Sequence, residues 1–259
     1  MFLIFDTETT GLPRNYKAPL TDFENWPRLV QIAWQLHDAQ GKLVEVKNFI
    51  IKPDGFTIPF NSEKIHGIST ERATKYGVEL SFVLDEFEAV LKRTDFNVGH
   101  NIEFDLNIMG AEFLRMGREN PLAKMKFLDT MKQTIDFCAL TGGRGGRFKY
   151  PNLSELYRKL FEEDFKEAHN ASADVEATTR SFLELVRREI IPAKKLNFTS
   201  EQTRAFKKAN PRAIKLIGLN IEPYNPHELE VDEKPELKKE NASEPSNDSH
   251  LPVSEKLEN

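Results

Sequence analysis

The order of apolar patterns along the chain restricts its fold more than any other feature. Three strand-like segments come first, at residues 2–6, 30–38 and 42–51. Gly41 lies between the last two and predicts a hairpin turn that pairs them antiparallel. Helical patterns then alternate with brief strands, with helices at 81–93, 102–116, 130–140, 152–161 and 172–190 and strands at 96–99 and 127–130. This alternation predicts an α/β layer architecture.

The chain changes character beyond Pro192. Residues 187–215 hold nine basic and two acidic residues, so their net charge is 9 − 2 = +7, and residues 226–259 hold four basic and ten acidic ones, or 4 − 10 = −6. The acidic stretch has few large apolar side chains and cannot offset the entropy of ordering. We therefore expect one domain at 1–190, a basic linker with short helices at 191–225, and a disordered acidic tail at 226–259.

Composition fits a globular protein that works in a reducing compartment. The chain has 259 residues and a single cysteine, Cys138, which cannot form an internal disulfide and which we interpret as a small buried side chain. No apolar run is of transmembrane length, so we expect a cytoplasmic protein without a membrane partner. The net charge of −5 does not exclude a nucleic-acid ligand, because a strongly basic segment follows the first domain.

Asp6 and Glu8 stand two residues apart at the end of the first strand pattern, FLIFDTE. A period of two places both carboxylates on the same face of a strand. Adjacent hard anions repel unless cations lie between them, which makes the pair natural ligands for Mg²⁺ or Mn²⁺. The same spacing also arises by chance, so the pair needs support from other segments.

Two further segments carry acids at the start of predicted helices. Asp105 follows Phe104 in VGHNIEFDLNIMG, and Asp174 follows His169 by five residues in AHNASADVEATTR. A helix N-terminus favours a negative charge, and a helix that begins near Ala171 would leave His169 in the preceding loop. Taken separately, each segment is also compatible with an ordinary solvated helix start.

The segment GGRGGRFKYP at 142–151 combines four glycines with Arg144, Arg147 and Lys149. Four glycines cannot pack a core, so we predict a mobile loop. Two interpretations remain open. The loop is either a solvated connection or a basic clamp on phosphates.

The three acid-bearing segments, together with EKIHGIS at 63–69, resemble the histidine (DEDDh) branch of the 3′–5′ exonuclease superfamily, and within it the proofreading epsilon subunit of bacterial DNA polymerase III and its stand-alone relatives. The matching motifs are Asp6-Thr-Glu-Thr-Thr-Gly, Ile65-His66-Gly67-Ile68, His100-Asn101-x-x-Phe104-Asp105 and His169-x4-Asp174. The resemblance covers residues 2–187, so the exonuclease domain would occupy 1–190. It implies a ribonuclease H-like fold, with a mixed five-stranded sheet and helices on both faces.

The resemblance also implies a catalytic set and a substrate pocket. Two Mg²⁺ ions per site, replaceable by Mn²⁺, would be held by Asp6, Glu8, Asp105 and Asp174, and His169 would act as general base on the attacking water. Each cut would release a 5′-monophosphate nucleotide. The expected substrate-binding residues are Thr7, Thr9, Thr10, Leu12, Ile65, His66, His100, Asn101 and Phe104. Leu12 and Phe104 would hold the terminal base from either side, and the Ile65-His66-Gly67-Ile68 motif would lie in a loop before a helix.

Three functions remain open at this level. The leading one is a DNA 3′–5′ exonuclease in proofreading or repair. The others are a ribonuclease of the same fold acting on RNA 3′ ends and a non-catalytic nucleic-acid-binding module, which the complete set of acids disfavours. A DNA polymerase is a candidate partner, and so is a sliding clamp, because Gln202-Thr-Arg-Ala-Phe206 faintly resembles a clamp-binding peptide. A plain amphipathic helix with a Thr199-x-x-Gln202 capping box explains that segment better. The oligomeric state is not predicted.

Overall fold

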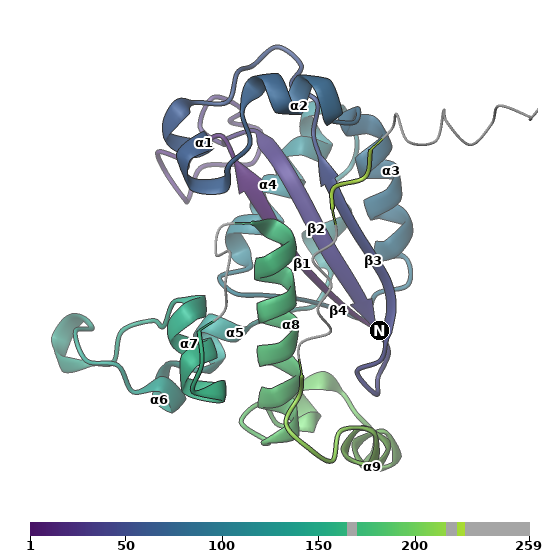
Figure 1. Ribbon diagram of the computed structural model, residues 1–259, viewed down its shortest axis with the longest axis vertical. Helices are drawn as coiled ribbons and strands as arrows, with labels where there is room; N and C mark the ends of the chain where they lie inside the picture. The colour runs from purple at the N-terminus through teal and green to yellow at the C-terminus, as the bar shows by residue number, and fades with distance from the viewer. Residues whose placement is uncertain (165–169, 216–221, 226–259) are drawn as a thin grey trace, which may run out of the picture.

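The structure is a computed structural model of the chain, and it describes residues 1–164, 170–215 and 222–225. Figure 1 shows a central sheet flanked by helices. Residues 226–259, which include the predicted acidic tail, and His169 lie outside the described residues.

The sheet is mixed and has five strands in the order β3-β2-β1-β4-β5, as the resemblance implies. The strands are β1 (Phe2–Thr9), β2 (Leu29–His37), β3 (Leu43–Ile50), β4 (Phe96–Gly99) and β5 (Phe127–Asp129). β1 pairs antiparallel with β2, and β2 antiparallel with β3, so the predicted hairpin at Gly41 is confirmed. β4 runs parallel to both β1 and β5.

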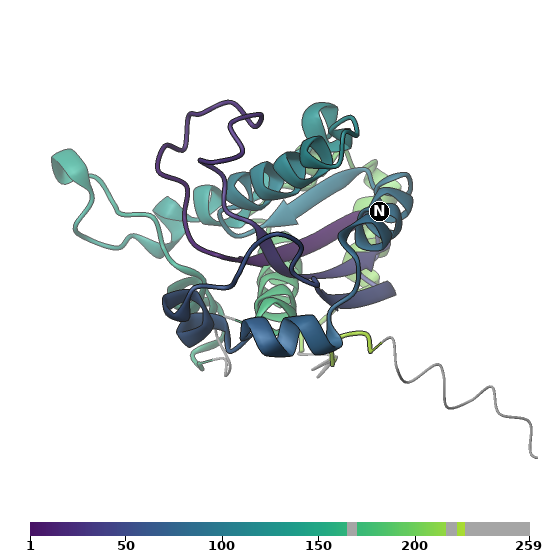
Figure 2. The same cartoon turned by 90° about the horizontal axis from the view of Figure 1, so that it is seen from above.

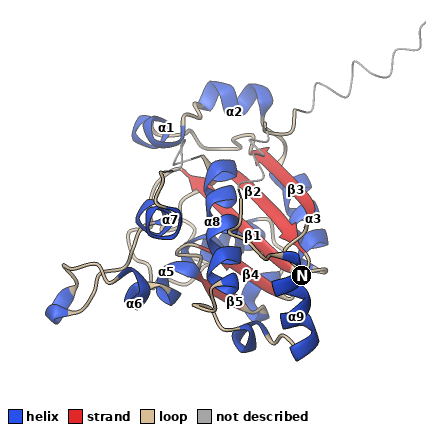
Figure 3. Cartoon of the chain, turned by 60° about the horizontal axis from the view of Figure 1, so that its bottom comes forward, coloured by secondary structure: helices blue, strands red, loops and turns tan. Residues whose placement is uncertain are grey.

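Each face of the sheet is covered by helices, which Figures 2 and 3 show from two further directions. Leu3 and Phe5 of β1 belong to the core with α3 (Leu80–Leu91) and α4 (Glu103–Arg115). Phe2 and Ile4 belong to the core with α7 (Leu153–Phe161) and α8 (Ala171–Arg187). The alternation of β1 side chains between two cores is what a doubly covered central strand requires.

β4 is much shorter than β1, so the second half of β1 does not pair with β4. Their pairing runs from Phe2↔Phe96 to Ile4↔Val98. β1 continues to Thr9, so the edge of β1 that faces β4 lacks a strand partner from about Asp6 onward. The helix that follows β4 can therefore bring a side chain against the β1 backbone at this point.

The helix α1 (Phe60–His66), between β3 and α3, was not predicted, and the helix expected after the Ile65-His66-Gly67-Ile68 motif is α2 (Thr70–Tyr76). The prediction that the Ile65-His66-Gly67-Ile68 motif lies in a loop is wrong for its first half, because Ile65 and His66 form the last turn of α1. Gly67 ends this helix with a φ of 74°, a conformation that glycine adopts without steric cost.

The helix predicted at 130–140 is also wrong in part. It is broken into α5 (Thr130–Gln133) and α6 (Ile135–Cys138), because Thr134 between them has non-helical angles (φ −118°, ψ 11°). Cys138 is buried, as predicted. Short 3-10 helices complete the described chain before the C-terminal part: η1 (Pro121–Lys124) and η2 (Arg144–Gly146).

The described C-terminal part packs on the sheet domain. η3 (Ala193–Leu196) and α9 (Ser200–Ala209) follow α8, and Leu196 and Phe206 are buried in the same core as Phe182. The predicted capping box of α9, Thr199 with Gln202, is confirmed. None of the helices in the described part of the chain is both long and apolar enough to cross a membrane.

Candidate active site

The first element of the site is a cluster of three carboxylates. Asp6 and Glu8 project from the same side of β1, and Asp174 lies in the first turn of α8. One carboxylate oxygen from each lies within 4.8 Å of the other two. The predicted juxtaposition of the two acids of β1 with Asp174 of α8 is therefore present.

Asp105 reaches the same region from the other face of the sheet. It lies in the first turn of α4 and is only 4% exposed. Its Oδ1 accepts a hydrogen bond from the backbone N–H of Thr7 at 3.0 Å and another from the Thr7 hydroxyl at 2.6 Å. This contact is made in the part of β1 that does not pair with β4. The side chain of Thr7, predicted among the substrate contacts, is thus directed at Asp105.

Burial and neighbouring carboxylates raise the pKa of three of these acids, Asp6, Glu8 and Asp105. Burial, followed by the charges of Asp105, Asp174 and Glu8, raises the pKa of Asp6 well above its ordinary value. Burial, followed by the charges of Asp174 and Asp105, raises the pKa of Glu8 to about 8. Burial raises the pKa of Asp105 to about 7, although the two hydrogen bonds from Thr7 act in the opposite direction. The protein therefore holds several partly enclosed anions close together at an energetic cost.

This donor set fits divalent cations of the hard type. Carboxylate oxygens are the ligands that Mg²⁺ and Mn²⁺ prefer, and converging anions that repel one another are stabilised when cations lie between them. Asp105 enters from the opposite face to Asp174, so the acids offer ligands from two directions. We therefore assign Asp6, Glu8, Asp105 and Asp174 as the residues that could hold the metals.

The start of α8 is fixed by local sequence. The Asn170 side chain caps the helix by accepting a hydrogen bond from the backbone N–H of Ser172 at 3.0 Å. The predicted helix start near Ala171 is therefore confirmed, and Asp174 is in its first turn. His169 directly precedes the capping residue in sequence.

The side chain of His66 lies near the backbone of Thr9, which directly follows Glu8 in the sequence. The side chains of Thr9 and His66 are buried, at 8% and 7% exposure. Nδ1 of His66 accepts a hydrogen bond from the backbone N–H of Ile68, whereas its Nε2 has no hydrogen-bond partner among the described residues. Burial lowers the pKa of His66, and the nearby backbone of Thr9 partly offsets this effect. Buried polar atoms without a hydrogen-bond partner are uncommon in folded proteins, so the enclosed Nε2 of His66 marks this position as unusual.

The turn after Glu8 presents one apolar side chain outward. The Thr10 hydroxyl accepts a hydrogen bond from the backbone N–H of Arg28 at 2.9 Å, so it anchors the turn. Leu12 is 72% exposed, and Ile65 at the end of α1 is 58% exposed. Phe104 is half-buried against the core that contains α4. Exposed apolar side chains next to a polar site are suitable contacts for a nucleotide base.

His100 and Asn101 contact neighbouring protein groups. The ring nitrogens of His100 lie 3.0 Å from the Thr130 hydroxyl and 2.9 Å from the carbonyl oxygen of Pro151. Asn101 has a positive φ of 67° and donates its backbone N–H to Asp129. In the structure, both residues shape the loop that leads into the helix carrying Asp105.

Asp129 and Thr130 were not predicted as part of this arrangement. Asp129 is 3% exposed, and its Oδ1 accepts hydrogen bonds from the N–H groups of Asn101 and Met131. The Thr130 hydroxyl donates to the carbonyl oxygen of Gly99. The available sequence signal was the Asp-Thr pair at the junction of a strand and a helix, the usual place for a capping residue.

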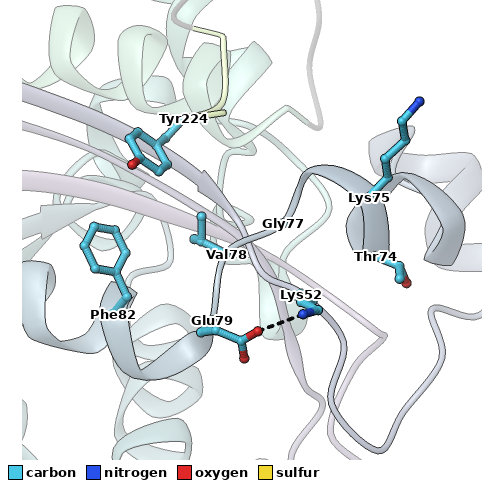
Figure 4. A pocket seen from close by; sticks show the side chains of 8 residues that line it. All are labelled: Lys52, Thr74, Lys75, Gly77, Val78, Glu79, Phe82 and Tyr224. Carbon is cyan, nitrogen blue, oxygen red and sulfur yellow. Dashed lines mark hydrogen bonds and ion pairs between the residues drawn. The ribbon is translucent and has the colours of Figure 1, made fainter. Parts of the chain in front are cut away.

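A separate hollow of about 410 Å³ lies between α2, α3 and the segment that contains Tyr224. Figure 4 shows Phe82 and Tyr224 on one side of it and the Lys52–Glu79 ion pair, at 2.9 Å, on another. None of the predicted site residues lines this hollow. The acids and the substrate contacts therefore belong to a different part of the surface.

Comparison with protein families gives a match over most of the chain. The model of the family described as Exonuclease (RNase_T) matches residues 3–182. No curated protein matches. The match includes Asp6, Glu8, Asp105 and Asp174, the four acids that the structure brings together.

Solved structures of Exonuclease I from E. coli are similar in fold. The complex with a dT13 oligonucleotide has a TM-score of 0.60 at 22% identity and covers 79% of this chain and 45% of that chain. The complex with a dA16 oligonucleotide has a TM-score of 0.59 at 20% identity, with the same coverage. The zinc-bound form of its complex with single-stranded DNA has a TM-score of 0.56 at 21% identity and covers 80% and 42%.

These likenesses support the predicted ribonuclease H-like architecture, and the chain spans less than half the length of these structures. The predicted resemblance is confirmed at the level of the family. The comparisons do not single out the epsilon subunit of bacterial DNA polymerase III.

Proposed function

Because the chain belongs to the Exonuclease family, whose members hydrolyse phosphodiester bonds, we propose that it is a two-metal 3′–5′ exonuclease acting on DNA. Its task would be proofreading or repair, and each cut would release a 5′-monophosphate nucleotide. The observation that carries the proposal is the convergence of Asp6, Glu8 and Asp174 within 4.8 Å, with Asp105 held beside them by Thr7.

The acids have one role in this proposal, which is to hold two Mg²⁺ or Mn²⁺ ions. When bound, such ions stabilise charge on the phosphate and make water a better nucleophile at neutral pH. By analogy with the family, Asp6 would help to hold both ions. Glu8 and Asp174 would help to hold one of them, and Asp105 the other. Thr7 fixes the carboxylate of Asp105 and is a positioning residue.

We assign proton transfer to His169, following the histidine pattern of the family. An imidazole suits this role because its pKa is close to neutrality. His169 precedes Asn170, whose cap fixes the start of α8, and Asp174 follows in the first turn. The base and a metal ligand therefore come from one short stretch of chain, although His169 itself lies outside the described residues.

The terminal nucleotide would bind beside Thr9 and His66. The exposed side chains of Leu12 and Ile65 can contact the base together with Phe104. Such apolar contacts accept any base, so we expect weak sequence preference. His100 and Asn101 would contribute indirectly, because they shape the loop before α4.

DNA is the favoured substrate because the similar E. coli structures are complexes with DNA oligonucleotides. A ribonuclease of the same fold is the alternative, since recognition of a 2′-hydroxyl depends on a few local contacts. The sliding-clamp interpretation loses support, because Gln202 caps α9 and Phe206 is 2% exposed in the core. A DNA polymerase partner remains a hypothesis within the proofreading role.

The test uses end-labelled single-stranded DNA and RNA of matched sequence, incubated with the protein in Mg²⁺. We expect stepwise shortening of the DNA from its 3′ end, lost in Asp6→Ala. Asp85→Ala, which alters an exposed acid on α3, is the matched control and should retain activity. Faster shortening of RNA would establish the ribonuclease. No shortening of either strand in Mg²⁺ or Mn²⁺ would reject the enzyme and leave a binding module.

A further inference from the structure

Residues 141–150 form a projection that we call the arm. It leaves the body between α6 and α7, and it carries the short helix η2 at its outer end (Figures 1 and 2). The backbone N–H of Lys149 donates to the carbonyl oxygen of Leu140 at 2.9 Å and closes the base of the arm. The arm lies next to a hollow of about 830 Å³.

Glycines determine the shape of the arm. Gly142, Gly145 and Gly146 have φ values of 103°, 67° and 76°, which other residues rarely adopt. A Cβ on Gly143 would lie 2.4 Å from the carbonyl oxygen of Arg147, so the two sides of the arm approach more closely than a side chain allows. The arm therefore has a specific backbone course that requires these glycines.

The arm presents cations that the protein itself does not use. The side chains of Arg144 and Arg147 make no hydrogen bond or ion pair with the residues that the structure describes. By contrast, Arg115 and Arg187 are both paired with buried glutamates. Guanidinium groups that are held on a shaped loop without protein acceptors are available for phosphate.

Two aromatic side chains accompany these arginines. Phe148 is 44% exposed and Tyr150 is 57% exposed, and both line the hollow with Arg144 and Arg147. Large aromatic side chains left in water carry a hydrophobic cost that a stacked base would remove. Alternating cationic and aromatic groups are the composition of surfaces that bind single-stranded nucleic acid.

The base of the arm is attached to the structure around Asp105. The carbonyl oxygen of Pro151, directly after the arm, lies 2.9 Å from Nε2 of His100. Lys132, on α5 after β5, forms an ion pair with Glu103 at 2.6 Å in the first turn of α4; this contact raises the pKa of Lys132, and the charge of Tyr150 adds a smaller effect in the same direction. The arm therefore starts beside the helix turn that presents Asp105.

We infer that the arm is a binding site for the single-stranded nucleic acid upstream of the cleaved end. Arg144 and Arg147 contact phosphates, and Phe148 and Tyr150 stack on bases. The inference rests on the proposed function, because the catalytic pocket gives the strand its direction. Its consequence is that the protein binds long strands more tightly than the terminal nucleotide alone can explain.

The first test measures binding without catalysis. A fluorescent single-stranded DNA of about 20 nucleotides is titrated in Ca²⁺, which we use to limit cleavage, over a range of salt concentrations. Arg144→Ala/Arg147→Ala should weaken binding tenfold or more at moderate salt. It should also reduce the slope of log K against log[salt] by about 1.4, since each phosphate contact on a single strand contributes about 0.7. Phe148→Ala/Tyr150→Ala should weaken binding by about fivefold or more without changing this slope.

A matched control separates the arm from general charge. Arg204→Ala/Arg212→Ala removes the same charge from exposed positions in and after α9, a helix that lies on the other side of α8 from the arm in Figure 1. This control should bind as the wild type does. An equal loss in the control and arm variants would overturn the inference, and so would unchanged binding by the arm variants. Thermal melting of every variant should match the wild type, because all substituted side chains are exposed.

A small substrate separates this inference from the proposed function. The p-nitrophenyl ester of thymidine 5′-monophosphate contains one nucleotide and cannot reach the arm. The arm variants should hydrolyse it at the wild-type rate while losing activity on the long strand. Failure of the wild type to hydrolyse either substrate would reject the exonuclease but not the binding result. Equal loss on the ester and the strand would reject the arm as a strand-binding site.

Discussion

The chain buries acids in two regions, and the surroundings shift their pKa values in opposite directions. At the active site, burial and neighbouring carboxylates raise the pKa of Glu8 to about 8 and that of Asp105 to about 7. Near the other end of α8, burial also raises the pKa of Glu184, but hydrogen bonds from Arg187, the backbone N–H of Ile214 and Arg188 outweigh it and bring the pKa to about 2. The side chain of Glu184 is fully buried.

The difference separates a structural acid from a functional one. Glu184 is neutralised by arginines of its own chain, and it ties α8 to Ile214 in the C-terminal segment through a hydrogen bond of 3.0 Å. The acids at the active site repel one another, so a cation from outside would relieve them. An enclosed acid whose pKa is raised by other acids therefore indicates a ligand site, whereas one whose pKa is lowered by arginines indicates a fold contact.

The largest expected effect follows from removing the central acid of the cluster. Asp6→Asn should reduce exonuclease activity by roughly 10³-fold or more, because metal-based charge stabilisation contributes several kcal/mol. In EDTA the same variant should melt at a higher temperature than the wild type, because one repelling charge is gone. Activity assays and thermal melting of the same preparation measure both effects.

A matched variant shows whether the stability gain is specific to the cluster. Asp85→Asn changes an exposed acid of α3 and removes its surface ion pair with Arg118, which contributes at most about 1 kcal/mol, so activity should be unchanged and the melting temperature should not rise. If Asp6→Asn melted below the wild type in EDTA, Asp6 would be a structural acid like Glu184, and the contrast between the two regions would be lost.

Addition of metal should stabilise the active-site region and leave the Glu184 region unaffected. At 100 times the dissociation constant, a bound ion contributes about 2.7 kcal/mol, which corresponds to a rise of about 5–10 °C in melting temperature for a domain of this size. Mg²⁺ and Mn²⁺ should both produce the rise and EDTA should reverse it. An equal rise in Asp6→Asn would show that the ions bind elsewhere.

Thr7 connects the two faces of the sheet at the site, and its removal should have an intermediate effect. Thr7→Val keeps the shape of the side chain but loses the 2.6 Å hydrogen bond to Asp105. We expect kcat to fall by about 10- to 100-fold, as for other groups that orient metal ligands. The concentration of Mg²⁺ needed for half-maximal activity should increase.

Thr7→Ser retains the hydroxyl and should restore most of the activity. This rescue distinguishes a positioning role from a general packing role, because serine packs less well than valine in a buried position. A serine variant as impaired as the valine variant would show that the methyl group matters more than the hydrogen bond.

The sequence predicts the acids of β1 well because their arrangement is local. A period of two along FLIFDTE places Asp6 and Glu8 together, and Asn170 before a helical pattern marks the start of α8. The approach of Asp105 to Thr7 depends instead on where β4 stops against β1, at the pair Ile4↔Val98. That register is a long-range property, and no local pattern contains it.

The unpredicted helix has a similar explanation. α1 has seven residues, and its capping position is Pro59, which offers no side-chain hydrogen bond. Its polar sequence shows no repeated apolar spacing, so tertiary contacts rather than propensity hold it. The break at Thr134 coincides with a local hydrogen bond, because the buried Thr134 hydroxyl donates to the carbonyl oxygen of Thr130 at 2.7 Å and so competes with the helix.

The smallest expected effect concerns the pH dependence of the Glu184 region. The folded pKa of Glu184, about 2, lies below its ordinary value of 4.5. Its charge therefore stabilises the fold fully above about pH 4.5, and this contribution is lost as the pH falls toward 2. Glu184→Gln cannot titrate, so it should be less stable than the wild type by about 1–2 kcal/mol at pH 7. This difference in the free energy of unfolding should narrow progressively below pH 4.5.

Urea unfolding at pH 7, 4 and 3 measures the difference in stability between the wild type and Glu184→Gln. Glu119→Gln is an exposed control whose stability should equal that of the wild type at each pH. A difference that stayed constant from pH 7 to pH 3 would mean that glutamine loses packing rather than charge. The comparison between Glu184, an acid paired with arginines, and the active-site acids would then lose its basis.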